Sequence, residues 1–310
     1  MDELSIVIVT WNSADVIERC LSSLDQFRPG CDHTVTVVDN ASQDATADLV
    51  SAKFPQFQLI RNEENRGFAA ANNRALESTA GRYILLLNPD SEVRDDSIDR
   101  LVDFMNQHDH AWVAGPALVN SDGTRQHYGV RFLNIWNMLV EAFYFDKLFP
   151  RSRIFGRHKE MFLEQDAPRR VDFVQGAAFM VRRDAVNAVG LLDEGFFMYF
   201  EEADWCYRMG QSGGETWLIP TSRISHHGGT DPGHYDETRL IHYHRSLLRF
   251  LRKHYGFLCR TAARFVVLLR TLVRFVSWSL VLTLRPGMRQ AAKSSLRGYL
   301  GVFRILLLGG

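Results

Sequence analysis

The feature that most constrains the fold is an apolar, β-branched run followed by a helical pattern, repeated along the first 90 residues. The predicted strands cover residues 4–10, 34–38, 57–60 and 83–87. Runs this apolar are typical of strands that are buried on both faces of a parallel sheet. Because strands and helices alternate, the sequence predicts a doubly wound α/β sheet.

Polar residues stand at the carboxyl ends of three predicted strands, at residues 10–12, 39–42 and 88–90. In open α/β sheets, ligands bind beyond this edge. Asp39 is similar in position to an acidic residue that binds a ribose hydroxyl, although Asp-Asn-Ala-Ser also suits an Asx turn or a helix cap. No GxGxxG or GxxxxGK[ST] pattern occurs, which argues against a dehydrogenase and a P-loop protein.

A cluster of carboxylates near residue 200 predicts a chemical role. It consists of Glu201, Glu202 and Asp204, flanked by the aromatic residues Tyr199, Phe200 and Trp205. Apolar walls and neighbouring like charges raise the pKa of at least one carboxyl group, which suits a general base. The residues that follow have a helical pattern, so the alternative is that these carboxylates only complement a helix dipole.

Three other stretches have predicted roles near a ligand. Residues 171–181 are predicted as a strand whose small residues, at Gly176, would let a ligand approach the backbone. Two strand-like stretches, residues 216–219 and 223–225, lead to His226-His227-Gly228-Gly229, which is either a ligand site or a pair of surface histidines. The aromatic residues 131–170 have no clear period, and either bind an acceptor or a membrane or pack as an ordinary insertion.

The charge of the chain is unevenly distributed although its formal net value is zero. Residues 236–310 hold 14 Lys and Arg but two acidic residues, whereas residues 1–235 hold 22 basic and 34 acidic ones. The four cysteines show no CxxC spacing, which argues against a zinc cluster and a disulfide framework and makes a reducing compartment the default. The first residues do not resemble a secretory signal.

The basic tail is predicted to be helical over residues 238–255, 257–284 and 298–310, after a linker at Pro232-Gly233. Its longest uncharged run has ten residues, too short for a spanning helix of about 20 apolar residues. The pattern therefore predicts a basic amphipathic helix at the interface of an anionic membrane. A core helix with a solvated basic face is the alternative, and nucleic-acid binding is disfavoured by the large apolar face. Seven arginines share one predicted helical face: Arg245, Arg249, Arg252, Arg260, Arg264, Arg270 and Arg274.

Seven motifs in order resemble those of the family 2 glycosyltransferases, which have the GT-A fold. The resemblance covers roughly residues 4–235 and is greatest to bacterial rhamnosyltransferases of cell-surface polysaccharide assembly. The motifs are Ile6-Val7-Ile8-Val9-Thr10-Trp11-Asn12, Val38-Asp39-Asn40-Ala41-Ser42, Asn65-Arg66-Gly67-Phe68-Ala69, Leu87-Asn88-Pro89-Asp90, Gly176-Ala177-Ala178-Phe179-Met180, Phe200-Glu201-Glu202-Ala203-Asp204 and His226-His227-Gly228-Gly229.

The resemblance implies a role for each motif. The donor nucleotide sugar would be bound by Thr10, Asn12, Asp39, Asn65, Arg66, Gly67, Asn88, Asp90 and Gly176. Asp90 and His226 would hold a divalent cation on the diphosphate, Mg²⁺ or Mn²⁺, and the imidazole slightly favours Mn²⁺. Glu202 would be the catalytic base of a single inverting displacement, with Asp204 as the fallback.

Two residues depart from the family pattern. Asn88 stands where the family's DxD motif has its first acid, which leaves fewer charges for a metal. Glu201-Glu202 stands where a Glu-Asp pair is usual, so the base would be a longer carboxylate.

The sequence thus predicts a GT-A catalytic domain over residues 1–235, with a nucleotide-binding half to about residue 115 and an acceptor-side half after it. A membrane-associating helical extension follows over residues 236–310. The predicted activity is inverting transfer of a sugar, rhamnose first, from a UDP- or dTDP-sugar to a lipid-linked glycan. The predicted location is the cytoplasmic face of the cell membrane. A sugar-1-phosphate nucleotidyltransferase and an inactive membrane-bound scaffold are the alternatives, and the oligomeric state is left open.

Overall fold

The computed structural model describes residues 3–126, 130–156, 158, 166–228 and 237–308. The chain divides into two compact units, neither of which is continuous in sequence. The first unit comprises residues 1–130, 164–197 and 201–229, and because it holds the predicted catalytic residues we call it the catalytic unit below. The helical unit comprises residues 131–163, 198–200 and 230–310. The predicted linker at Pro232-Gly233 lies outside the described residues.

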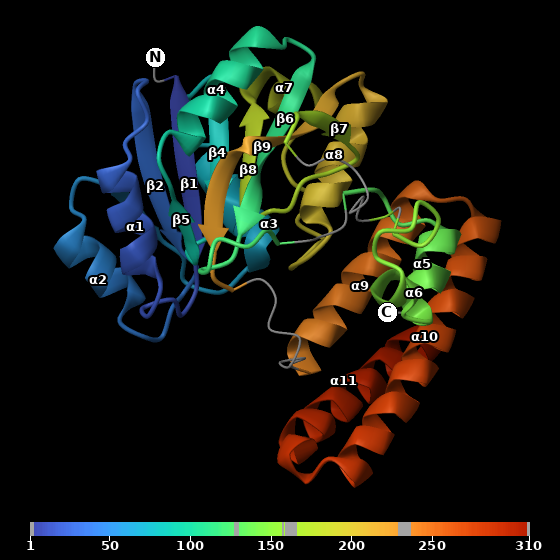
Figure 1. Ribbon diagram of the computed structural model, residues 1–310. Helices are drawn as coiled ribbons and strands as arrows, with labels where there is room; N and C mark the ends of the chain where they lie inside the picture. Colours follow the sequence, from blue (N-terminus) through green and yellow to red (C-terminus); the bar gives the residue numbers. More distant parts are fainter. Residues whose placement is uncertain (1–2, 127–129, 157, 159–165, 229–236, 309–310) are drawn as a thin grey trace. The chain divides into compact units, whose positions relative to one another are not determined.

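The catalytic unit is built on one mixed sheet with the strand order β3-β2-β1-β4-β8-β6-β9-β5, and β7 pairs with β9 (Figure 1). The strands are β1 (Leu4–Thr10), β2 (His33–Asp39), β3 (Gln58–Arg61), β4 (Tyr83–Leu87), β5 (Ser91–Val93), β6 (Ala111–Val119), β7 (Arg169–Val171), β8 (Ala178–Arg182) and β9 (Glu215–His226). Strands β1 to β4 are mutually parallel, as the alternating pattern predicts. Strand β8 then runs antiparallel to β4.

Helices cover the parallel strands because those strands are apolar on both faces. Every residue of β1 is buried, and Leu4, Ile6 and Ile8 share a core cluster with residues of α1 (Ile17–Gln26) and α4 (Ser97–Gln107). Helix α2 (Thr46–Lys53) adds Val50 to the same cluster. The Ala-rich α3 (Gly67–Leu76) contacts β1 and β2, where its small side chains allow close packing.

The second half of the sheet differs from its predicted outline in two places. The strand predicted over residues 171–181 is two strands, β7 and β8, separated by a loop that contains Gly176. The stretches predicted separately within residues 216–225 are one strand, β9, with a register shift against β6 between Pro116 and Ala117. Helices α7 (Arg183–Val189) and α8 (Glu201–Gln211) complete the unit.

The helical unit joins two distant parts of the sequence around one small core. Its elements are α5 (Ile135–Ala142), α6 (Phe145–Leu148), α9 (Glu237–His254), α10 (Phe257–Leu284), η1 (Pro286–Met288) and α11 (Arg289–Leu308). Leu133 and Met138 pack with Leu247, Leu251 and Val267 of the tail helices. Helices α10 and α11 lie side by side (Figure 1). Residues 131–163 therefore fold together with the tail.

The arginines of the tail do not share one exposed face, which corrects the sequence-based expectation. The helix ends at His254 and restarts at Phe257, so the arginines belong to two helices. Arg270 and Arg274 point into the unit, toward Glu141 and Tyr144 respectively. The outer face of α10 instead carries exposed apolar side chains: Leu258, Phe265, Leu268, Leu272, Val276, Leu280 and Leu284. The periodicity of a helix shows which residues share a face, but it does not show which face packs against the rest of the protein.

Among the described residues, α10 is the one helix that is long and apolar enough to cross a membrane by length and composition. The sequence analysis disfavoured a spanning helix because charges interrupt this segment. Two arginines within the apolar part, Arg270 and Arg274, are turned inward. The outer surface of α10 is thus more apolar than its sequence suggests.

Candidate active site

The predicted site residues gather at one edge of the sheet because of strand direction. Thr10, Asp39 and Asn88 end or follow parallel strands, so they lie at the same edge. Strand β8 is antiparallel to β4 and pairs Ala178 with Leu87, which brings the loop with Gly176 to that edge. Strand β6 is antiparallel to β8 and parallel to β9, so His226 ends there too.

Thr10 and Asp39 lie side by side at the sheet edge. They are direct register partners at the ends of β1 and β2, and both are buried. Asp39 Oδ2 accepts a hydrogen bond from Ser42 N at 3.3 Å. Asp39 Oδ1 and Thr10 Oγ1 are buried without a hydrogen-bond partner. Buried polar atoms in native proteins are nearly always paired, so these two atoms have unused hydrogen-bonding capacity at the sheet edge.

Asn12 is held in place by the neighbouring turn. It adopts a left-handed conformation (φ 49°), which Asn tolerates better than most residues. Its N–H donates to Ser42 Oγ at 2.9 Å, and its Oδ1 accepts from Gln43 N at 2.7 Å. Its side-chain oxygen therefore ties the β1 and β2 loops together.

The loop from Asn65 to Gly67 is shaped by Asn40, a residue that the sequence analysis did not assign to the site. Asn40 Nδ2 donates to Asn65 Oδ1 at 2.9 Å, and Asn40 Oδ1 accepts from Arg66 N at 3.3 Å. Gly67 has φ 84°, and a Cβ atom there would overlap the carbonyl oxygen of Phe197. Asn40 directly follows Asp39, and that adjacency was the available sequence signal.

Arg66 and Asn88 are placed by contacts with other loops of the unit. The exposed Arg66 forms an ion pair with Glu194 (Nη2 to Oε2, 3.3 Å). The backbone of Asn88 is fixed because its N–H donates to Ala177 O at 2.9 Å and its carbonyl accepts from Ser91 N at 3.1 Å. This backbone pairing positions the turn that presents Asp90.

Asp90 and His226, predicted as metal ligands, lie together. His226 Nε2 is 3.4 Å from Asp90 Oδ1, and this oxygen is buried with no hydrogen-bond partner. A Cβ atom at Gly228 would overlap Asp90 Oδ2, so the glycine is required for this approach. Gln126 orients the histidine, because its Nε2 donates to His226 O at 2.6 Å and its Oε1 lies 3.2 Å from His226 Nδ1. Nothing in the sequence singled out Gln126.

The electrostatics of this pair fit a cation. Burial is the strongest influence on Asp90 and opposes its ionisation, but the interaction with His226 outweighs it, so the pKa of Asp90 lies below its usual value. An ionised carboxylate with a free oxygen beside an imidazole nitrogen is a suitable partial ligand set for Mn²⁺ or Mg²⁺. No cluster of three or more His, Cys, Asp or Glu side chains suited to a metal occurs among the described residues. Oxygen atoms of a bound ligand and of water would complete the coordination of the cation.

Glu202 meets the small-residue loop. A Cβ atom at Gly176 would lie 4.0 Å from the Glu202 carboxyl carbon and 3.9 Å from the Phe68 ring. Glu202 is partly exposed, whereas the adjacent Glu201 is buried, and each has an Oε2 atom without a hydrogen-bond partner. Burial raises the pKa of Glu202, and burial followed by the charge of Glu202 raises the pKa of Glu201. This pair therefore retains a proton at higher pH than ordinary carboxyls.

Asp204 has a different environment. It is fully buried, and its Oδ2 accepts from Arg208 Nε at 2.9 Å. Arg208 also donates to the carbonyl oxygens of Val189 (2.7 Å) and Leu191 (2.8 Å). This geometry fixes the loop before α8 and engages the Asp204 carboxylate in a buried ion pair.

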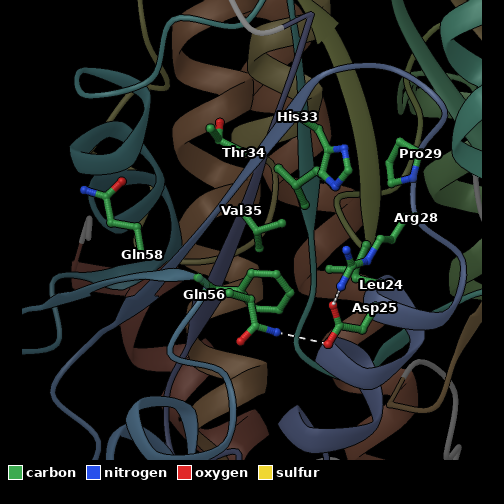
Figure 2. A pocket seen from close by; sticks show the side chains of 11 residues that line it. Leu24, Asp25, Arg28, Pro29, His33, Thr34, Val35, Gln56 and Gln58 are labelled. Atoms are coloured by element: carbon green, nitrogen blue, oxygen red, sulfur yellow. Dashed lines mark hydrogen bonds and ion pairs between the residues drawn. The ribbon is translucent and has the colours of Figure 1, made fainter.

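A cavity of about 330 Å³ lies elsewhere, near the amino ends of β2 and β3 (Figure 2). Its polar lining includes Asp25, which accepts hydrogen bonds from Arg28 and Gln56. None of the predicted site residues lines it. The strand-end edge therefore remains the candidate site.

The mixed sheet with polar and acidic residues at its strand ends is of the GT-A type, a fold that glycosyltransferases use. The sequence model of glycosyl transferase family 2 matches residues 5–190, and the chain belongs to this family. It is 27% identical over 263 residues to the N-acetylglucosaminyl-diphospho-decaprenol L-rhamnosyltransferase of Mycobacterium tuberculosis, covering 81% of this chain and 84% of that protein.

Solved structures confirm the fold. A mannosyltransferase from Pyrobaculum calidifontis, in complex with GDP-Man and Mn²⁺, matches with a TM-score of 0.60 at 13% identity, covering 100% of this chain and 88% of that one. GalNAc-T7, solved with UDP, GalNAc and Mn²⁺, matches with a TM-score of 0.57 at 16% identity over 81% of this chain. The chain spans about half (48%) of the GalNAc-T7 chain.

Proposed function

We propose that this family 2 glycosyltransferase inverts the anomeric configuration of a sugar as it transfers it from a nucleoside diphosphate to an acceptor hydroxyl. The observation that carries the proposal is Glu202. Its carboxylate lies against Gly176 at the sheet edge and keeps one oxygen without a partner. A carboxylate with a raised pKa that solvent can reach suits a general base.

The donor nucleoside would bind at the end of β1 and β2. Asp39 Oδ1 and Thr10 Oγ1 supply the two buried atoms that lack partners. The Asn65–Gly67 backbone and Asn12 would frame the base, and Arg66 and Asn88 would border the diphosphate. Gly176 leaves room for the sugar because it has no side chain.

Asp90 and His226 would hold Mn²⁺ or Mg²⁺ on the donor diphosphate. When bound, the cation neutralises charge that develops on the leaving group. The free oxygen of Asp90 supports this role, as do the two Mn²⁺-containing structural relatives.

Glu202 would accept the proton of the acceptor hydroxyl as that oxygen attacks the anomeric carbon. Glu201 would hold the shared proton when Glu202 is charged, since both carboxylates cannot ionise easily side by side. Asp204, the fallback base of the sequence analysis, is better explained as an anchor for Arg208.

The acceptor is proposed to be a lipid-linked glycan in cell-surface polysaccharide assembly, and the donor dTDP-rhamnose or a UDP-sugar. The support is the name of the mycobacterial relative, which acts on a diphospho-decaprenol substrate. The enzyme would associate with the inner face of the membrane through the helical unit, whose α10 exposes an apolar stripe. Catalysis by residues 1–235 and membrane association by the helices after residue 236 remain part of this proposal. Residues 131–163 would join the membrane-associating part because they fold with it.

A donor screen tests the proposal. Purified protein is incubated with a panel of UDP-, dTDP- and GDP-sugars and Mn²⁺, and release of nucleoside diphosphate is measured with and without a lipid-diphosphate-linked sugar. We expect slow donor hydrolysis with one nucleotide sugar and faster release when the acceptor is present. Binding without any turnover would indicate an inactive scaffold, and pyrophosphate release from a nucleoside triphosphate would indicate a nucleotidyltransferase.

A further inference from the structure

We propose that the helical unit contains a second anion site, at Arg270 and Arg274, that binds the diphosphate of an isoprenoid-linked acceptor. The inference rests on the proposed function for the identity of its ligand. Its physical basis is a half-buried guanidinium without a carboxylate partner among the described residues, that of Arg274, next to exposed aromatic side chains within one compact unit.

The charge around this site is unbalanced. Arg270 Nη1 lies 3.4 Å from Glu141 Oε2, and that carboxylate also lies 3.6 Å from His158 Nε2. Arg274 has no carboxylate within ion-pair distance among the described residues, and its guanidinium instead stacks 4.4 Å from the centre of the Tyr144 ring. Arg270 Nε and Arg274 Nε are both buried without hydrogen-bond partners.

A neighbouring histidine reports the positive potential. His244 is almost fully buried in α9, and its pKa is lowered to about 3, first by burial and then by the charge of Arg270 and Arg274. His244 therefore remains neutral at physiological pH and adds no further charge. Arg270 is paired with Glu141, whereas Arg274 is half-buried beside Tyr144 without a carboxylate partner among the described residues. Taking a charge partly out of water without a partner is costly, so an incoming anion would be stabilised at Arg274.

The spacing of the two arginines suits a diphosphate. They lie four residues apart on α10, so their Cβ atoms are about 6 Å apart on one face of the helix. The guanidinium carbon of Arg270 lies 5.5 Å from the centre of the Tyr243 ring, and that of Arg274 lies 4.4 Å from the centre of the Tyr144 ring. Arg270 donates from Nη1 to Glu141, so the phosphate contact would be made chiefly by Arg274, since guanidinium groups bind phosphate oxygens in a bidentate manner.

The surface beside Tyr144 is apolar, which favours a lipid over a free anion. Phe143 and Phe145 flank it in the chain, are exposed, and have ring centres 6.1 Å apart. Phe145 and Phe149 both contact the Phe155 ring, with centres 5.3 and 5.6 Å apart. If the diphosphate binds at Arg274, the attached isoprenoid chain would lie along this aromatic cluster. That placement removes apolar surface of both from water and is therefore favourable.

The test uses full-length protein in detergent and farnesyl diphosphate as the probe, with binding measured by calorimetry. We expect wild-type protein to bind farnesyl diphosphate, and Arg274→Gln to weaken that binding by about tenfold or more, since charge-assisted bonds are lost. The matched control is Arg285→Gln, an exposed arginine at the end of the same helix, which should change the affinity less than about twofold. Arg274→Lys keeps the positive charge but cannot bind phosphate in a bidentate manner, so its affinity for farnesyl diphosphate should fall between those of the other two variants.

Competition on wild-type protein keeps the test independent of how the variants fold. Inorganic pyrophosphate should displace farnesyl diphosphate, and farnesol should do so only weakly. Equal affinity in Arg274→Gln and Arg285→Gln, or failure of pyrophosphate to compete, would overturn the proposal. Equal binding of short-chain phosphatidylglycerol would overturn it in favour of a phospholipid headgroup site. UDP and dTDP binding is measured in parallel, so that failure of the donor site is distinguished from failure of this one.

Discussion

The sheet edge of the catalytic unit and the interior of the helical unit both contain unpartnered polar atoms, but of opposite charge. At the sheet edge these include the carboxylate oxygens of Asp39, Asp90 and Glu202, together with the Thr10 hydroxyl. In the helical unit they include guanidinium nitrogens of Arg270 and Arg274, together with His244 Nε2. The first set suits cations and hydrogen-bond donors, and the second suits an anion. The charge of an unpaired buried atom thus indicates the charge of the group that would pair with it, and its position indicates where that group would lie.

The largest expected effect concerns the two carboxylates of α8. Glu202→Gln should reduce turnover by roughly 10² or more, with little change in donor affinity, because it removes the proton acceptor. Steady-state transfer assays and calorimetry of nucleotide-sugar binding provide the measurements.

Asp204→Asn is the matched variant. It should lower the melting temperature, because it disturbs a buried ion pair with Arg208, while the folded fraction retains activity. If Asp204→Asn abolishes transfer and Glu202→Gln does not, the assignment of the base is wrong.

The next largest effect concerns the cation pair. Gly228→Ala introduces a methyl group that must displace Asp90, so metal-dependent donor binding should weaken by about tenfold or more. Asp90→Ala should have a similar effect, and chelation should abolish activity. Gly210→Ala is the control, since no atom lies within 4 Å of the added carbon, and it should be neutral or slightly stabilising. Full activity after exhaustive chelation would remove the metal from the mechanism.

A smaller effect is expected at the outer surface of the helical unit. In flotation assays, the protein should bind vesicles containing phosphatidylglycerol, be released only in part by high salt, and need detergent for full extraction. Salt screens the contribution of about 1 kcal/mol per basic residue near the surface, but not apolar burial. Phe265→Ser with Leu272→Ser should remove the salt-resistant fraction. Protein that stays at the bottom with anionic and neutral vesicles alike would exclude α10 as a membrane contact.

The smallest effect is a shift in pH dependence. Because the pKa values of Glu201 and Glu202 are raised, the acidic limb of the kcat/KM profile should lie above the range of ordinary carboxyls. Glu201→Gln should shift the limb little, because burial rather than the charge of Glu201 raises the pKa of Glu202. The exposed Glu77→Gln should leave the limb in place.

The raised pKa values of Glu201 and Glu202 also predict how the stability of the protein changes with pH. A carboxyl whose folded pKa is raised binds more protons in the folded state, so stability is lost as the pH rises through that pKa. Glu201→Gln should therefore raise the melting temperature at neutral pH, with the difference shrinking in acid. An equal difference at every pH would contradict the coupling.

The parallel half of the fold could be predicted because its information is local. Strands β1 and β4 begin and end at the predicted residues, since an unbroken apolar run specifies a doubly covered strand. Asp39 and Asp90 could be placed at one edge for the same reason, whereas the site role of His226 came from the family resemblance. Gly176 was assigned to a strand, because small apolar residues fit a strand as well as a loop. Gln126 could not be predicted, since its contact with His226 joins residues 100 positions apart.

In the helical unit, the sequence predicted the helices but not the direction in which their side chains point. The extents of α9 and α10 were predicted within a few residues, but not that Arg270 and Arg274 face inward. That orientation depends on Glu141 and Tyr144, which lie in the aromatic stretch that the periodicity left unassigned. The Asp204–Arg208 pair, by contrast, has the i, i+4 spacing of a helical ion pair, and the sequence could have indicated it.

The shared core of residues 131–163 and the tail has a consequence for how this enzyme can be rebuilt. Leu133 and Met138 pack against side chains contributed by α9 and α10. Trimming the chain after β9 would strip those partners away and leave an aggregation-prone apolar surface in mid-sequence. The tail therefore cannot be removed, or transferred to another protein, without residues 131–163. A soluble catalytic fragment would require both segments to be replaced together, with a short bridge between Val130 and the segment that leads into β7.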